Sequence, residues 1–284
     1  MKTNTVRCTY SLRLLVPLAA VLLNQRRSPS RDAALLLRGM SPPPRVLDAH
    51  HVPAASPFIL TVNHYDRPGL GAWWGIAAVV AAVSRQRADG SREIHFAMAR
   101  EWWYPRGVGK WFKQPLTRWF FGKFSRSYGA IPLPPVLGLK EFRGQGALAV
   151  RRTLAATRRD PPALIGIAPE GRTGANLELC MPPRGAGLFV LWMTHERIPI
   201  LPAGIYEDDT DGALTVRFGA PYALHVPPHL PRDERDALAA RQIMVAIGKL
   251  LPDRMWGAYR KEIEDEKRRA EKEQTICQNG QDVV

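Results

Sequence analysis

The sequence predicts an α/β fold: a single domain with a mixed, largely parallel central sheet flanked by helices. A short N-terminal helical segment and a charged C-terminal helix are expected in addition. Two observations lead to this prediction. Short apolar runs alternate along the chain with longer stretches of helical periodicity, which is typical of layered α/β proteins. The chain of 284 residues, 45% of them hydrophobic, is also long enough to bury a sizeable core.

The expected strands are short and rich in β-branched or apolar residues, and they cover residues 58–62, 94–98, 163–168, 198–205 and 214–218. Helical stretches lie between or after them, at residues 70–87, 107–124, 140–158, 185–197 and 233–251. Strands that alternate with helices favour parallel pairing, because each crossover helix returns the chain to the same end of the sheet.

Three segments are expected along the chain. Residues 1–44 form an N-terminal helical segment that contacts a membrane surface or packs on the domain. The prolines at positions 42–44 separate this segment from an α/β domain at residues 45–252, because proline stops helices. Residues 253–284 form a charged, solvated helix with a disordered tail, since acidic and basic residues are mixed there.

The net charge of +14 is concentrated in residues 1–60 and 84–126, where basic side chains far outnumber acidic ones. Such an excess suits anionic lipid, phosphorylated substrates or nucleic acid. No nucleic-acid reader motif is present, so nucleic acid is not an expected partner. Cys8, Cys180 and Cys277 show no metal-ligand spacing, and we expect reduced thiols in the cytoplasm and no bound metal.

Three stretches are candidates for membrane contact. Residues 14–23 are apolar but too short to cross a bilayer, and no cleavage site follows them, so a short surface or packed helix is expected. Residues 70–83 favour a buried helix over a membrane helix. Residues 107–124 place Phe112, Leu116, Trp119 and Phe120 on one helical face and basic or polar residues on the other. That pattern suits either a membrane-surface helix or a core helix with a solvated basic face.

Candidate catalytic residues follow two of the expected strands. His64 and Asp66 come directly after residues 58–62, and Glu170, Gly171 and Arg172 come after residues 163–168. An imidazole at the end of a strand can serve as a general base at the edge of a sheet. A guanidinium group can bind phosphate with two parallel hydrogen bonds.

Four motifs in this order resemble the glycerolipid acyltransferase family, which includes 1-acylglycerol-3-phosphate O-acyltransferases. They are Asn63-His64 after an apolar strand, Arg126 with Gly129-Ala130-Ile131-Pro132, Pro169-Glu170-Gly171-Arg172-Thr173, and residues 198–205. The resemblance covers roughly residues 46–220.

The resemblance implies acyl transfer from acyl-CoA or acyl carrier protein to a hydroxyl of a lysophospholipid or glycerol phosphate, with no further cofactor. His64 would take the proton of that hydroxyl, and an acid beside the ring would fix its tautomer. Arg67, Arg126 and Arg172 would bind phosphate, and Glu170 would orient the acceptor or hold an arginine. Such an enzyme is expected on the inner face of a membrane, bound peripherally to anionic lipid.

Two departures from the family pattern bear on this hypothesis. The family places an aspartate five residues after the histidine, where this chain has Gly69, and only Asp66 stands nearby. Asp66 is either the partner of His64 or the N-cap of the following helix. The family also reads Glu-Gly-Thr-Arg where this chain reads Glu170-Gly171-Arg172-Thr173. The alternative hypothesis is therefore a catalytically impaired acyltransferase fold that binds membrane lipid.

Overall fold

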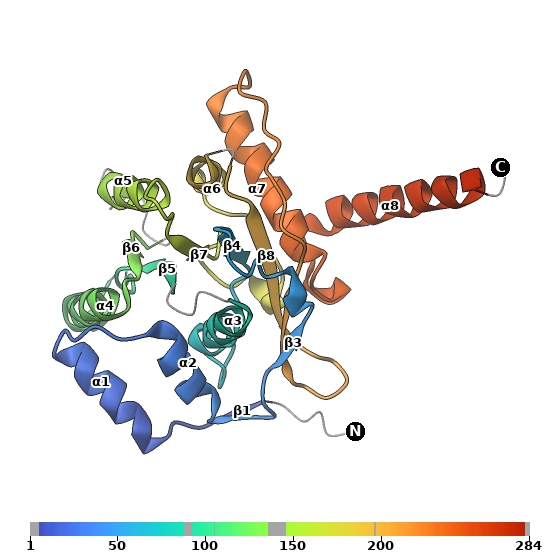
Figure 1. Ribbon diagram of the computed structural model, residues 1–284. Coiled ribbons are helices and arrows are strands. Elements are labelled where there is room, and N and C mark those ends of the chain that lie inside the picture. Colours follow the sequence, from blue (N-terminus) through green and yellow to red (C-terminus); the bar gives the residue numbers. More distant parts are fainter. Residues whose placement is uncertain (1–5, 88–92, 105, 136–145, 196, 282–284) are drawn as a thin grey trace.

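A computed structural model describes residues 6–87, 93–104, 106–135, 146–195 and 197–281, with side chains to residue 272. A seven-stranded sheet forms its centre, in the order β3-β9-β8-β4-β7-β5-β6 (Figure 1). In chain order the strands are β3 Arg45–Leu47, β4 Ile59–Val62, β5 Ile94–Ala99, β6 Ile131–Leu133, β7 Leu164–Ile167, β8 Ile200–Glu207 and β9 Leu214–Phe218. Every pair is parallel except β8 with β9, so the predicted mixed, largely parallel sheet is confirmed.

The sheet is covered by helices on both faces (Figure 1). In this view α2 and α3 lie below it, and α5, α6 and α7 lie above it. The bounds are α2 Pro29–Leu37, α3 Ala72–Gln86, α5 Gly146–Thr157, α6 Ala186–Thr194 and α7 Arg232–Gly248. The helix predicted at 140–158 is confirmed from Gly146 onward, and residues 140–145 lie outside the described part of the chain.

The N-terminal segment forms a helical pair beside the domain. Helix α1 (Leu15–Leu22) follows a 3₁₀ turn at Leu12–Leu14, and a two-stranded ribbon, β1 (Arg7–Cys8) with β2 (Met40–Ser41), closes the segment. Helix α2 was not predicted individually, although its start carries a recognisable signal. The Ser28 side chain accepts a hydrogen bond from the Arg31 amide, and Pro29 occupies the first helical turn.

The predicted core helix at 70–83 is confirmed. Helix α3 buries Trp74 and the run from Ala77 to Val83, and it leaves Trp73 half exposed. Within the described residues, no helix is long and apolar enough to cross a bilayer.

Helix α4 (Gln114–Tyr128) continues a π-helical turn at Gly109–Lys113, and together they form the amphipathic helix predicted at 107–124. Its orientation settles one open alternative, because the apolar residues of its apolar face are largely exposed, whereas Gln114 of the polar face points into the protein. Phe112 is 72% exposed, whereas Gln114 is buried and donates to the buried carboxylate of Glu101. Arg118 forms an ion pair with the same carboxylate. The alternative of a core helix with a solvated basic face is therefore wrong.

The C-terminal segment is only partly a solvated extension. After 3₁₀ turns at Asp253–Met255 and Gly257–Tyr259, helix α8 (Arg260–Gln281) projects from the body (Figure 1). Met255, Trp256, Tyr259 and Ile263 are nonetheless buried against the domain. The mixed charges of residues 253–284 concealed this contact, because the uncharged run at 255–259 was read together with the charged helix that follows it.

Candidate active site

The motif that contains His64 and the motif that contains Glu170 meet at the carboxyl ends of two central strands. Strands β4 and β7 are parallel neighbours, with Thr61 opposite Ile167, so both chains leave the sheet at the same end. His64 lies two residues beyond β4, and Glu170 lies three residues beyond β7. Ligand and catalytic sites in open α/β sheets form at the carboxyl ends of the strands.

Asn63 fixes the chain just before His64. Its side-chain amide donates to the Ile205 carbonyl at 2.9 Å and accepts from the Ile205 amide at 2.7 Å. Asn63 is buried, and a buried amide with both functions satisfied holds a single orientation. The end of β4 is thereby attached to β8, and the position of the His64 backbone is set on that side.

Glu170 fixes His64 from the other side. One carboxylate oxygen accepts from the His64 backbone amide at 2.9 Å, and the other accepts from the Cys180 amide at 2.7 Å. The residue is 1% exposed, and burial raises the pKa of its carboxyl to about 7, against the lowering effect of the two amides. Glu170 is therefore a buried clamp on the His64 loop, and it accepts no hydrogen bond from the His64 ring in the described contacts.

The His64 ring is held by a hydroxyl group. Its Nδ1 lies 2.8 Å from Oγ1 of Thr173, and its Nε2 has no hydrogen-bond partner among the described residues. Burial lowers the pKa of the imidazole below its usual value, and the charge of Asp66 opposes this shift. Burial therefore favours the neutral ring, which is the form a general base requires.

Asp66 does not contact the ring. Its side chain is exposed, and the structure shows no hydrogen bond between its carboxylate and His64. The alternative that Asp66 caps the next helix is wrong, because α3 begins at Ala72 with Gly71 at the N-cap. The hydrogen-bond partner of Nδ1 is therefore the hydroxyl of Thr173 and not the carboxylate of Asp66.

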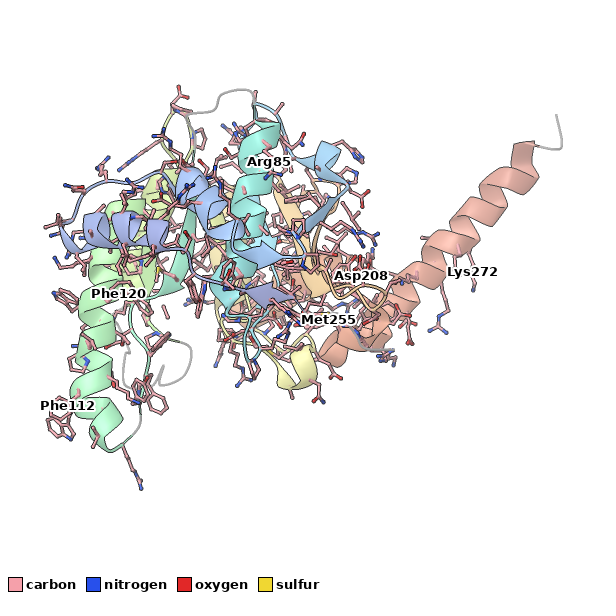
Figure 2. The ribbon with its side chains drawn as sticks, turned by 90° about the horizontal axis from the view of Figure 1, so that it is seen from below. Arg85, Phe112, Phe120, Asp208, Met255 and Lys272 are labelled. Atoms are coloured by element: carbon pink, nitrogen blue, oxygen red, sulfur yellow. The ribbon has the colours of Figure 1, made fainter. Side chains whose placement is uncertain are left out.

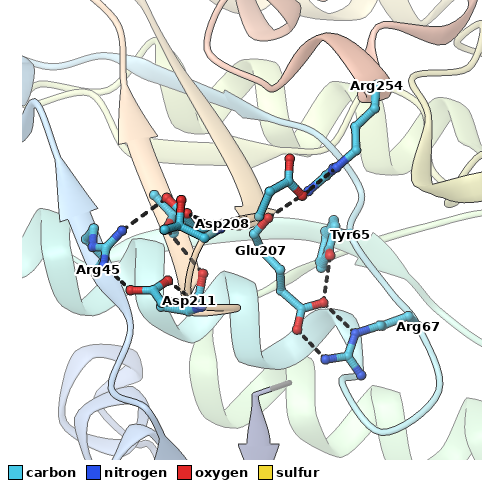
Figure 3. Close-up of polar contacts among 11 residues, drawn as sticks. Arg45, Tyr65, Arg67, Glu207, Asp208, Asp211 and Arg254 are labelled. Carbon is cyan, nitrogen blue, oxygen red and sulfur yellow. Dashed lines mark hydrogen bonds and ion pairs between the residues drawn. The ribbon is translucent and has the colours of Figure 1, made fainter. Parts of the chain in front are cut away.

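Arg67 is engaged in an ion pair. Its guanidinium group donates through two nitrogens to the carboxylate of Glu207 at the end of β8, and Tyr65 donates to the same carboxylate at 2.8 Å (Figure 3). This cluster fastens the loop after His64 to the neighbouring strand. The guanidinium group of Arg67 is therefore already paired with an acid. The sequence had led us to expect that Arg67 binds phosphate.

Arg172 and Arg126 are in different surroundings. Gly171 adopts a left-handed conformation (φ 63°) and its amide donates to the Ala168 carbonyl, which turns the chain after β7 and leaves Arg172 exposed. The positive charge of Arg172 lowers the pKa of Glu170, so Arg172 stands close to the clamp. Arg126 is exposed on α4, and its Nε donates to Asn24 in the N-terminal segment. No described contact joins Arg126 to His64 or Glu170.

An apolar cavity of about 290 Å³ lies between the N-terminal helices and the domain. Helices α1, α2, α3 and α4 and strand β5 contribute to its wall, which includes Trp73, Ile76, Ala77 and Phe96. Trp73 and Ile76 belong to the first turns of α3, the helix that follows the His64 loop. A cavity with this lining suits a hydrocarbon chain better than a polar ligand.

Sequence reasoning missed two residues of the site. Thr173 stands inside the second motif, but nothing in the sequence shows that its hydroxyl reaches the His64 ring. Glu207 ends β8, two residues after the motif at 198–205, but nothing in the sequence shows that its carboxylate reaches the loop after His64.

The chain was compared with known proteins. No family model and no curated protein sequence matches it. Among solved structures, it is similar to the 1-acyl-sn-glycerophosphate (LPA) acyltransferase PlsC from Thermotoga maritima, with 12% sequence identity, a TM-score of 0.46 and 82% of each chain covered.

Proposed function

We propose that this protein is an O-acyltransferase of the glycerolipid type, with His64 as the general base. The observation that carries the proposal is the His64 ring itself. The ring is hydrogen-bonded at Nδ1, and its Nε2 has no hydrogen-bond partner among the described residues. Asn63 and Glu170 fix the backbone on either side of the ring.

In the proposed reaction, His64 Nε2 takes the proton of an acceptor hydroxyl as that oxygen attacks the thioester carbonyl. The new C–O bond forms, the C–S bond breaks, and the leaving thiolate receives the proton. No covalent enzyme intermediate is required. The acyl thioester, acyl-CoA or acyl carrier protein, is a co-substrate, and the proposed reaction uses no resident cofactor.

The acceptor is proposed to be a lysophospholipid or glycerol phosphate. The exposed Arg172, which lies in the turn beside Glu170, would bind its phosphate. The acyl chain would occupy the apolar cavity beside α3. Arg67 would act indirectly, by holding the catalytic loop to Glu207.

The second candidate function is lipid binding without catalysis. It is favoured by one observation: among the residues that the structure describes, the hydrogen-bond partner of the His64 ring is a hydroxyl group and not the carboxylate common to histidine bases. Purified protein incubated with radiolabelled acyl-CoA and a panel of lysophospholipids and glycerol phosphate separates the two. We expect time-dependent transfer of label to one acceptor class. Retention of the lipids on the protein without transfer would support the second candidate.

The proposed enzyme contacts a membrane through an apolar surface on α1, on α4 and on the helical turns that precede them. Leu12 is 83% exposed, and Trp111 is 77% exposed. The members of this apolar surface are all large hydrophobic side chains that are exposed to solvent: Leu12, Leu15, Val16, Leu23, Trp111, Phe112, Leu116 and Trp119. Helices α1 and α4 pack against each other, and Phe112 points outward from the π-helical turn that precedes α4 (Figure 2). Exposed Arg13, Lys110 and Lys113 accompany the apolar surface and suit anionic headgroups. The protein would thus lie on the cytoplasmic face of a membrane.

A variant with Trp111, Phe112 and Trp119 changed to glutamine tests this surface. We expect at least a tenfold loss of binding to phosphatidylglycerol vesicles in co-sedimentation, because each aromatic contributes about 1 kcal/mol or more when it leaves water. Met181→Gln/Trp192→Gln is the control, since it changes exposed apolar side chains outside this apolar surface. Vesicle binding that is equal in both variants would contradict the assignment.

A further inference from the structure

The hydroxyl group of Thr173 stands where a carboxylate would be expected in a histidine base. Its Oγ1 lies 2.8 Å from Nδ1 of His64, while Asp66 points to solvent and Glu170 bonds two backbone amides. These contacts leave the hydroxyl as the group that meets the Nδ1 side of the ring.

A neutral imidazole carries one proton, on either Nδ1 or Nε2. If the Thr173 hydroxyl donates the hydrogen bond to Nδ1, the proton of the ring lies on Nε2 and that nitrogen cannot act as a base. If Nδ1–H donates to Thr173, Nε2 presents a lone pair to the substrate. The direction of this bond therefore decides whether the site can catalyse proton transfer.

We propose that Thr173 is the positioning residue of the site: its Oγ1 accepts from His64 Nδ1–H and thereby keeps Nε2 as the base. This inference rests on the proposed function. It also makes chemical sense of the two sequence departures, because the Arg172-Thr173 order puts a hydroxyl at the ring of a chain that carries Gly69.

The arrangement differs from a histidine–carboxylate pair in one respect. A carboxylate orients the ring and also stabilises its protonated form, whereas a hydroxyl only orients it. Asp66 is the charged residue that raises the pKa of the ring, and burial outweighs its effect. Burial therefore favours the neutral form of the base.

Two-bond ¹H–¹⁵N correlation spectra of ¹⁵N-labelled protein report the tautomer directly, and His64→Ala identifies the His64 signals. We expect the Nδ1–H tautomer in the native protein, its loss in Thr173→Val, and its return in Thr173→Ser. Thr173→Asp is expected to raise the pKa of His64 by about one unit or more, because a carboxylate then faces the ring. Native protein in the Nε2–H form, or Thr173→Val in the Nδ1–H form, would overturn the inference.

Kinetics give the second test. Thr173→Val is expected to lower kcat by about 10–100-fold with little change in KM, because the hydroxyl acts on ring orientation and not on substrate binding. Thr173→Ser is expected to restore most of kcat. An unchanged kcat in Thr173→Val would overturn the role even if the tautomer is as expected. The spectra need no activity, so a native Nδ1–H tautomer in a protein without acyl transfer would count against the proposed function alone.

Discussion

Replacing His64 with alanine is expected to lower kcat for acyl transfer by about 10²–10⁴-fold, because the reaction then has no group to remove the proton of the acceptor hydroxyl. Binding to anionic vesicles is expected to stay at the native level, since the apolar surface lies on α1, on α4 and on the helical turns that precede them. Labelled-acyl transfer and vesicle co-sedimentation, measured on the same preparation, check both expectations.

The pH dependence of the native enzyme adds a constraint on the same residue. His64 is active when neutral, so kcat/KM rises as pH rises through its pKa, and burial places that pKa below 6.5. We therefore expect the acid limb of the profile to lie at lower pH than the ordinary pKa of histidine would place it. His225→Ala, which changes an exposed histidine, is the matched control. Full turnover by His64→Ala would exclude the mechanism.

Much of the fold follows from sequence because local pattern and global layer structure agree. The strand predicted at 214–218 matches β9, and the other four predicted strands each correspond to one strand of the sheet. Strands β3 and β6 were missed because each is only three residues long, too short for a recognisable period.

The site was less accessible to sequence reasoning than the fold. His64 and Glu170 lie close together because β4 and β7 are parallel and have their carboxyl ends on the same side of the sheet. The sequence indicated this, since each of the two predicted strands is followed by a candidate catalytic residue. The path of two loops decides that Thr173, and not Asp66, contacts the His64 ring. No periodic pattern in the sequence encodes such a path. Likewise, the Arg67–Glu207 pair joins residues that are 140 positions apart.

Replacing Glu170 with alanine is expected to destabilise the fold as well as the reaction. The change leaves the His64 and Cys180 amides without an acceptor, and each unsatisfied buried donor costs about 1–3 kcal/mol. We expect the free energy of unfolding to fall by about 2–6 kcal/mol at pH 7, as measured by urea denaturation. The kcat value should fall too, because the His64 backbone loses its attachment to the β7 loop. Glu178→Ala, in the same loop, is the control, and comparable losses in both variants would contradict a specific clamp.

Glu170→Gln tests the titration of Glu170, because glutamine has nearly the same size but carries no titratable group. The pKa of Glu170 is 4.5 in the ordinary state and about 7 in the folded protein, so the folded state binds the proton more tightly. The resulting contribution to stability is complete below about pH 4.5 and is lost as pH rises through 7. Glutamine does not titrate. The stability difference, native minus Glu170→Gln, should therefore decrease from pH 5 to pH 8, while contributions from all other groups cancel. A difference that stays constant over this range would mean that Glu170 is ionised throughout, and that the two amides outweigh its burial.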